Sequence, residues 1–285
     1  MIRESDSGCF TVEVSGKVAH LRLARPEKLN SMIREFWTEL PQIVRELDSG
    51  GDVRALVISS TGKHFCAGMD LGVFTSGETS LSSDGSEETG RVRARLRQTA
   101  LMLQDSFTSF EQARMPVLVA IQGGCIGGAV DMVCAADMRY ATEDAFFVIQ
   151  EINIGMTADV GTLQRLPKLI PDGIVRELAY TGERMSARRA AELGLVNHVY
   201  ADHDEMVEAV LEIAATIASK SPLAIWGTKE MLTYARDHSV TDSLNHVATW
   251  QTGMFQPADM LEALTAKAEG RDTDFPDLLP TPEAF

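Results

Sequence analysis

Three carboxyl groups have surroundings that suit acid–base chemistry: Asp131, Glu151 and Asp159. Asp131 lies within the apolar run 129–136, and the other two lie in a loop that contains Gly155. A carboxyl group in an apolar neighbourhood has a raised pKa and can act as a general acid or base. Each also has a plain structural interpretation, Asp131 as a cap or ion-pair partner and the other two as turn residues. If the fold gathers all three, they could move protons on a bound substrate.

A glycine-rich turn precedes Asp131. Residues 117–121 are apolar and β-branched, which predicts a buried strand, and residues 129–136 predict a helix. Between them stand Gly123, Gly124, Gly127 and Gly128. Unpaired backbone N–H groups at the start of a helix can hold a developing negative charge. The alternative is a tight turn that packs the helix on the strand. The spacing fits neither a P-loop nor a Rossmann fingerprint.

Other elements must position these groups. Residues 9–23 predict a hairpin that turns at Ser15 and Gly16, and residues 53–59 predict a strand. Residues 62–71 follow that strand as a second glycine-bearing turn, where further N–H groups could gather. We expect two more strands and two more helices, with a polar surface loop before the second helix: strands 138–141 and 145–149, helices 36–47 and 92–113, and loop 75–91.

The pattern changes near residue 200. Strands and helices alternate before it, and the chain then predicts helices at 203–220, from Pro222 onward, and at 242–267. We therefore expect an α/β body over residues 1–200 and a helical C-terminal region over residues 201–285.

Composition excludes several classes of partner. The 285 residues carry a formal net charge of −15, which argues against nucleic-acid and anionic-membrane surfaces. No apolar run approaches the roughly 20 residues of a membrane span. The ends of the sequence lack a signal-peptide core and the peroxisomal tripeptide, so we expect a cytoplasmic protein.

The cysteines and histidines predict no metal site. Cys9, Cys66, Cys125 and Cys134 show no C-x-x-C spacing, and the six histidines are scattered without an H-E-x-x-H or H-x-H pair. We expect reduced structural thiols and no metal.

Residues 64–71 together with residues 123–131 resemble the two loop motifs of the crotonase (enoyl-CoA hydratase/isomerase) superfamily. Within it, residues 144–168 resemble the Δ3,5-Δ2,4-dienoyl-CoA isomerases, as do residues 221–229 and 234–250. The resemblance spans residues 10 to 269 and implies a spiral of ββα turns with C-terminal helices at a trimer interface, with trimers often paired into hexamers. The loop motifs specify the superfamily, and the carboxylate pattern narrows it.

The resemblance also implies roles for individual residues. The N–H groups of Met69 and Gly128 would form an oxyanion hole for the thioester carbonyl. Hydratases usually have two glutamates at the positions of Asp131 and Glu151, and often a glycine at the position of Asp159. Both departures match the dienoyl-CoA isomerase pattern and count against simple hydration.

A mechanism follows from these roles. Glu151 would remove a proton from C2 of a 3,5-dienoyl-CoA, and Asp159 would return one at C6 to give the 2,4-dienoyl-CoA, while Asp131 tunes or orients Glu151. We expect Glu151 to start ionised and Asp159, as a second buried acid, to start protonated. The reaction needs neither redox cofactor nor metal, since coenzyme A is part of the substrate.

The resemblance implies that coenzyme A lies along one turn, with basic side chains near its phosphates. The turn residues are Ala67, Gly68, Asp70 and Leu71, and the basic candidates are Arg25, Lys28 and Lys229. Alternative functions are a 2-enoyl-CoA hydratase or Δ3-Δ2-enoyl-CoA isomerase on the same scaffold and, in another class, a non-catalytic acyl-CoA binding subunit. We expect a homotrimer or homohexamer that binds an acyl-CoA thioester.

Overall fold

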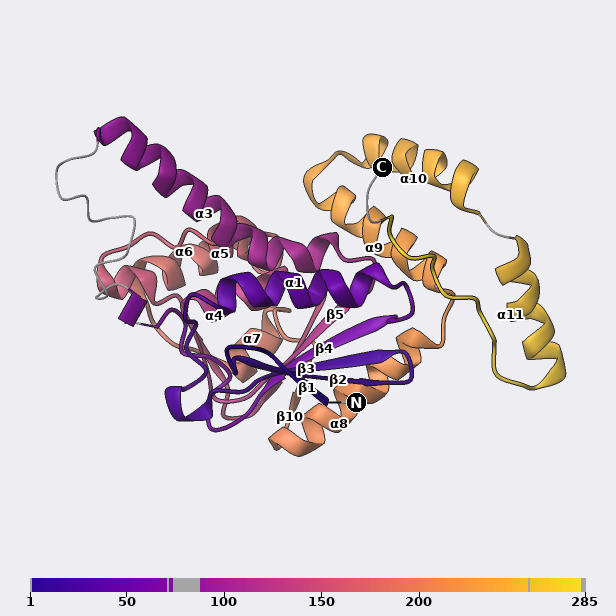
Figure 1. Ribbon diagram of the computed structural model, residues 1–285, viewed down its shortest axis with the longest axis horizontal. Coiled ribbons are helices and arrows are strands. Elements are labelled where there is room, and N and C mark those ends of the chain that lie inside the picture. The colour runs from indigo at the N-terminus through magenta and orange to yellow at the C-terminus, as the bar shows by residue number, and fades with distance from the viewer. Residues whose placement is uncertain (1, 71, 74–87, 256, 283–285) are drawn as a thin grey trace.

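A seven-stranded sheet forms the centre of the molecule. The computed structural model describes residues 2–70, 72–73, 88–255 and 257–282 (Figure 1). The strand order is β1-β2-β3-β4-β5-β7-β10. These strands are β1 (Ile2–Glu4), β2 (Phe10–Ser15), β3 (Val18–Leu23), β4 (Ala55–Ser60), β5 (Val117–Ile121), β7 (Met138–Thr142) and β10 (His198–Tyr200). β1 to β3 pair antiparallel, and every pairing from β3 to β10 is parallel.

Helices cover both faces of this sheet. One face packs on α1 (Phe36–Ser49), the end of α3 (Thr89–Gln112) and α4 (Gly128–Ala135), and the other packs on α8 (His203–Ala218). Alternate residues of β4 divide between the two cores, with Leu56 facing the first and Val57 the second. Burial on both faces explains why β4 and β5 are apolar along most of their length.

A second, three-stranded sheet lies beside the glycine turn. It consists of β6 (Gly124–Ile126), β8 (Phe146–Val148) and β9 (Met185–Ser186), with β6 parallel to β8 and β9 antiparallel. Short helical segments join the remaining elements: η1 (Pro26–Lys28), η2 (Glu151–Ile154), α5 (Thr162–Arg165), η3 (Leu166–Lys168), α6 (Asp172–Thr181) and α7 (Ala187–Glu192).

The C-terminal helices extend away from the sheet, as Figure 1 shows. They are α9 (Pro222–Asp237), α10 (Val240–Met254) and α11 (Pro257–Glu269). The rings of Trp226 and Trp250 meet edge to face at 5.1 Å between centroids, which packs α9 on α10. After α11 the chain returns to the body, where Asp277 pairs with Lys17 and Arg54.

The α/β class with C-terminal helices is confirmed, and so are the hairpin of β2 and β3, strands β4, β5, β7 and β8, and helix α1. Three local predictions were wrong. The 123–128 turn contains strand β6, because its backbone pairs with β8. The predicted helix 242–267 is two helices, since Phe255 is extended and Pro257 lacks an N–H group. The predicted loop 75–91 ends earlier, because the Glu88 carboxylate caps α3 and starts that helix at Thr89. The rest of that loop, residues 75–87, lies outside the described residues.

Helix α8 belongs to the core of the sheet. Met206, Val210 and Ala214 are fully buried and pack on Val57 and Leu118. Apolar packing therefore crosses the predicted boundary after residue 200, and that boundary stays a prediction. Among the described residues, no single helix is both long and apolar enough to cross a membrane; α8 and α9 together meet those criteria but bend by 107° at their junction.

Replacing Met206 by alanine should destabilise the whole sheet. The side chain is fully buried between α8 and the strands, so its loss should lower the free energy of unfolding by about 2–5 kcal/mol. Denaturant unfolding at fixed protein concentration measures this, with the exposed Glu208→Ala on the same helix as control. An unchanged midpoint for Met206→Ala would contradict the packing of α8 as part of one cooperative core.

Candidate active site

The two glycine-bearing turns lie against each other. Cys66 and Cys125 form a parallel bridge, in which Cys66 N–H donates to the Gly124 carbonyl at 3.1 Å and the Cys66 carbonyl accepts from Ile126 N–H at 3.1 Å. A Cβ atom on Gly68 would lie 2.6 Å from the Ile126 carbonyl oxygen, and Gly68 has φ +82°. Only glycine permits this approach of two backbones.

This approach brings together two N–H groups that have no acceptor among the described residues. Met32 N–H donates to the Gly68 carbonyl at 2.8 Å, and Asp70 N–H donates to the Met32 carbonyl at 3.0 Å. These two bonds fix the backbone on both sides of Met69. Gly128 is the first residue of α4, where helical N–H groups lack partners. Over the described part of the chain, the N–H groups of Met69 and Gly128 donate no hydrogen bond. A Cβ atom on Gly68 would also lie only 3.4 Å from the Gly128 nitrogen, so the two turns can direct donors at one point.

Asp131 lies in the first turn of α4 and is 1% exposed. Its Oδ1 accepts a hydrogen bond from Thr162 N–H at 2.6 Å, and its Oδ2 has no partner among the described residues. Burial raises the pKa of Asp131, and the bond from Thr162 opposes that rise. A buried, half-satisfied carboxyl is costly for folding and characteristic of functional sites.

Glu151 begins η2 and lies close to the turn before α4. A Cβ atom on Gly127 would lie 3.2 Å from Glu151 Oε1. Burial and then the negative charge of Asp131 raise the pKa of Glu151 from 4.5 to about 7, and Asp159 adds to the rise. A carboxyl group with this pKa can take up and release protons near neutral pH.

Asp159 is the exposed member of the group. Its backbone carbonyl accepts a hydrogen bond from Gln104 Nε2 at 2.8 Å. Partial burial raises the pKa of Asp159, and its charge raises the pKa of both Asp131 and Glu151. The expectation that Asp159 is buried was wrong, because the loop leaves its side chain open to the surface. The structure thus brings all three carboxyl groups into electrostatic contact beside the α4 turn.

The residues expected to contact coenzyme A surround a second loop. Ala67 N–H donates to the Leu29 carbonyl at 3.0 Å, which aligns the turn with η1. The Asp70 carboxylate accepts a hydrogen bond from Ser31 Oγ at 2.7 Å. This bond lowers the pKa of Asp70 below its ordinary value, and the positive charges of Arg25 and Lys28 lower it further. Arg25 is largely buried and lies 4.0 Å from Asp70, and Lys28 is exposed. Leu71 lies outside the described residues.

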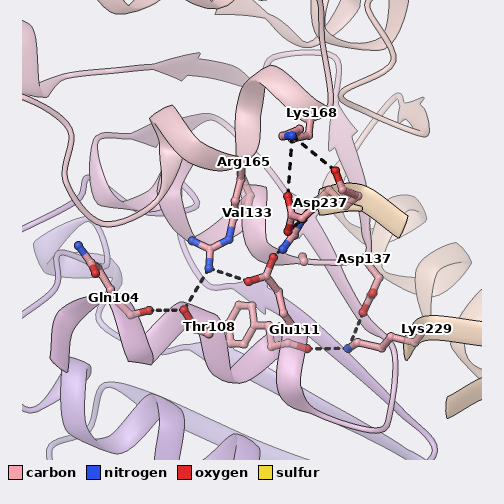
Figure 2. Close-up of polar contacts among 12 residues, drawn as sticks. Gln104, Thr108, Glu111, Val133, Asp137, Arg165, Lys168, Lys229 and Asp237 are labelled. Carbon is pink, nitrogen blue, oxygen red and sulfur yellow. Dashed lines mark hydrogen bonds and ion pairs between the residues drawn. The ribbon is translucent and has the colours of Figure 1, made fainter. Parts of the chain in front are cut away.

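Lys229 is not available to a ligand. It is 6% exposed, and its Nζ donates to the carbonyl oxygens of Phe110 and Met115 and pairs with Asp137 at 2.9 Å (Figure 2). Its suggested role near the phosphates was wrong, because helix α9 turns this side chain into the body.

Sequence reasoning missed the residues that hold the acids in place. Thr162 and Gln104 act on the site through a backbone N–H group and a side-chain amide, and neither lies in a motif. All four cysteines are buried and free, which confirms the prediction of reduced thiols. Within the described ranges, no group of three or more His, Cys, Asp and Glu side chains is arranged to hold a metal ion.

Comparison with known proteins decides the family. Residues 13–278 match the enoyl-CoA hydratase/isomerase family model. The chain belongs to this family. The predicted superfamily is confirmed, and the crotonase-like architecture with it. The solved enoyl-CoA hydratase of Bacillus anthracis superposes with a TM-score of 0.82 at 29% identity, covering 94% of this chain and 98% of that one. The Pseudomonas aeruginosa DspI structure gives 0.83 at 29% identity, covering 96% and 98%.

Curated relatives of this family member carry more specific names. The chain is 45% identical to the mitochondrial Δ3,5-Δ2,4-dienoyl-CoA isomerase of Mus musculus, covering 94% of this chain and 83% of the relative. It is 42% identical to the peroxisomal Δ3,5-Δ2,4-dienoyl-CoA isomerase of Arabidopsis thaliana, covering 92% and 93%. These names contradict the predicted cytoplasmic location. The prediction rested on the absence of two short address signals, and such an absence does not fix a location.

Replacing Asp131 by asparagine should lower the pKa of Glu151 from about 7 towards 4.5. Asparagine keeps an oxygen for Thr162 N–H but removes the negative charge that opposes ionisation of Glu151. Carboxyl carbon NMR across pH 4–9 measures the change, and an unchanged titration would contradict the coupling.

The raised pKa of Glu151 also makes the stability of the fold depend on pH. Between pH 4.5 and about 7 the folded chain holds a proton on Glu151 that the unfolded chain has released, so this group makes stability fall as pH rises. We expect a smaller fall in Asp131→Asn, measured by denaturant unfolding at pH 5 and pH 8.

Proposed function

We propose that this protein is a Δ3,5-Δ2,4-dienoyl-CoA isomerase, which moves a proton from C2 to C6 of a 3,5-dienoyl-CoA. The observation that carries the proposal is the electrostatic contact among Asp131, Glu151 and Asp159 beside an N–H pair. Relatives of that name, 42–45% identical across most of the chain, support it. The reaction extends a conjugated system, so it needs a base at one end and an acid at the other.

The N–H groups of Met69 and Gly128 would hold the thioester oxygen. Removal of the C2 proton places negative charge on that oxygen, and preorganised backbone donors stabilise it at no cost of reorganisation. The helix dipole of α4, whose first residue is Gly128, favours the same charge. Losing one such donor typically costs about 3–4 kcal/mol of transition-state stabilisation.

Glu151 would be the base at C2. A pKa of about 7 makes its carboxylate abundant at neutral pH and basic enough to accept a proton from an acidified carbon. Asp131, which cannot reach water, would act through Glu151: its charge raises the basicity of that carboxylate.

Asp159 would be the acid at C6. Asp159 stands next to the buried Val160, on the loop whose Thr162 N–H donates to Asp131. It therefore lies on the same side of the proposed site as the other two acids. Its pKa is already raised in the free chain, and a bound acyl chain would exclude more water and raise it further. A higher pKa keeps the proton on Asp159 until the dienolate takes it.

Coenzyme A would lie along the turn of Ala67, Gly68, Asp70 and Leu71. Arg25 and Lys28 flank that turn and would meet the phosphates, because Asp70 offsets only part of their positive charge. No redox cofactor or metal enters this proposal: two carboxyl groups and two N–H donors suffice.

The C-terminal helices would join copies of the chain into a homotrimer or homohexamer. Apolar side chains of α10 and α11 are exposed in the single chain: Leu244 is 63%, Leu261 58% and Leu264 59% exposed. A groove of about 560 Å³ between α9, α10 and α11 is lined by Met231, Trp250 and Met260, among others. Exposed apolar surface of this kind marks an interaction site.

Absorbance of the 2,4-dienoyl thioester should grow when the purified protein meets a 3,5-dienoyl-CoA. Glu151→Gln and Asp159→Asn should each slow that growth by about 10²–10⁴-fold, because each removes one proton-transfer group. Asp172→Asn is the matched control, since Asp172 is exposed and pairs only with Arg176 among the described residues.

Three outcomes would contradict the proposal. Hydration of a 2-enoyl-CoA without isomerisation would assign a hydratase, and full isomerase activity in Asp159→Asn would remove that residue from the chemistry. Binding of thioesters without any turnover would indicate an acyl-CoA binding subunit.

A further inference from the structure

The loop that carries Asp159 is held at both ends by hydrogen bonds. Gln104 on α3 donates to the Asp159 carbonyl at 2.8 Å, and Thr162 N–H donates to Asp131 at 2.6 Å. Between them, Val160 and Gly161 border a cavity of about 300 Å³. Packing alone therefore leaves space beside the loop, and polar contacts must define its position.

The Arg165 side chain lies beside Val160 and Gly161, in the middle of this loop. Its guanidinium donates to Glu111 at 2.7 Å and to Thr108 Oγ1 at 3.1 Å, both on α3, as Figure 2 shows. Its Nη1 also lies 3.5 Å from the Val160 carbonyl oxygen, at the long limit of a hydrogen bond. Arg165 thus connects the loop to the same helix that holds Asp159 through Gln104.

Gly161 makes room for that guanidinium. A Cβ atom at residue 161 would lie 2.0 Å from Arg165 Nη1, and the backbone there has φ +140°. Arg165 cannot simply swing away, because Glu111 and Thr108 hold it from the other side. The loop and the arginine therefore share one geometry.

Glu111 extends the connection to the C-terminal helices. Its second oxygen accepts from Arg236 on α9, and the two arginines hold its pKa below the ordinary value although burial opposes this. Close by, Lys168 pairs with Asp237 at 3.8 Å. The chain of contacts runs from α9 through α3 to the loop of Asp159.

We propose that Gln104 and Arg165 are positioning residues that place Asp159 for proton delivery at C6. The inference rests on the proposed isomerase function and deepens it. Both residues act through the 159–162 backbone and touch neither Glu151 nor the N–H groups of Met69 and Gly128. The hydrogen bonds of Gln104 and Arg165 therefore bear on the second proton transfer. Towards the first transfer Arg165 acts through its charge, which lowers the pKa of Asp131.

The two steps can be followed separately in D₂O. Reversible proton removal at C2 by Glu151 exchanges the C2 hydrogens of the 3,5-dienoyl-CoA with solvent, whether or not C6 is protonated. Formation of the 2,4-diene requires Asp159 as well. NMR of the remaining substrate reports the first step, and ultraviolet absorbance of the product reports the second.

The test compares Gln104→Ala, Arg165→Gln and Arg165→Lys with wild type. Arg188→Gln is the matched control, since Arg188 is exposed and pairs with Glu192 on the surface. We expect Gln104→Ala and Arg165→Gln to keep C2 exchange while 2,4-diene formation falls, on the order of 100-fold for a displacement near 1 Å. Arg165→Lys should recover part of the rate, since it keeps the charge but not the forked contact.

Parallel loss of both steps would assign these residues a merely structural role, and unchanged diene formation would remove them from the reaction; either result overturns the inference. If Arg165→Gln does not fold, Gln104→Ala decides alone, because it loses a single hydrogen bond. A wild-type protein that performs neither step would refute the isomerase proposal itself, and this inference with it.

Discussion

The bond between Thr162 N–H and the Asp131 carboxyl group is the constraint on which the site depends. Thr162 is the residue that hydrogen-bonds the Asp131 carboxyl group, and this contact joins α4, which begins at Gly128, to the loop of Asp159. Burying a carboxyl group with one oxygen unsatisfied destabilises the fold. The same burial lets its charge act at full strength on Glu151, since no water screens it.

Beside Asp131, two turns that are far apart in the sequence lie against each other. The Gly68 turn lies against the turn before Gly128 through the bridge of Cys66 and Cys125, and Glu151 lies beside Gly127. The N–H groups of Met69 and Gly128, which are the oxyanion donors in the proposed mechanism, are therefore positioned by backbone pairing. Preorganised donors aimed at the charge that develops in a transition state are usually the largest single contribution to catalysis.

The sequence predicted the local features and missed those that depend on three-dimensional contact. Apolar periodicity located β4, β5 and α1, and the carboxylate pattern located Asp131, Glu151 and Asp159. It could not show that Lys229 points inward to two carbonyl oxygens and the Asp137 carboxylate, because a lysine in an amphipathic helix is ordinarily interpreted as a surface charge. Nor could it show that Asp159 is exposed, or that Gln104 holds it, since both follow from how α3 crosses the loop. The cytoplasmic location, predicted from the absence of two signals, was contradicted by relatives named for mitochondria and peroxisomes.

In the proposed mechanism, two different carboxyl groups serve C2 and C6. A 3,5-dienoyl-CoA carrying deuterium at C2, converted in ordinary water, tests it most directly by NMR of the product. If two separate groups act, we expect protium at C6 of the product, because Asp159 is exposed and takes its proton from solvent. Deuterium at C6 would show that one group carries the same hydrogen from C2 to C6, and would contradict the assignment of Glu151 and Asp159 to separate steps.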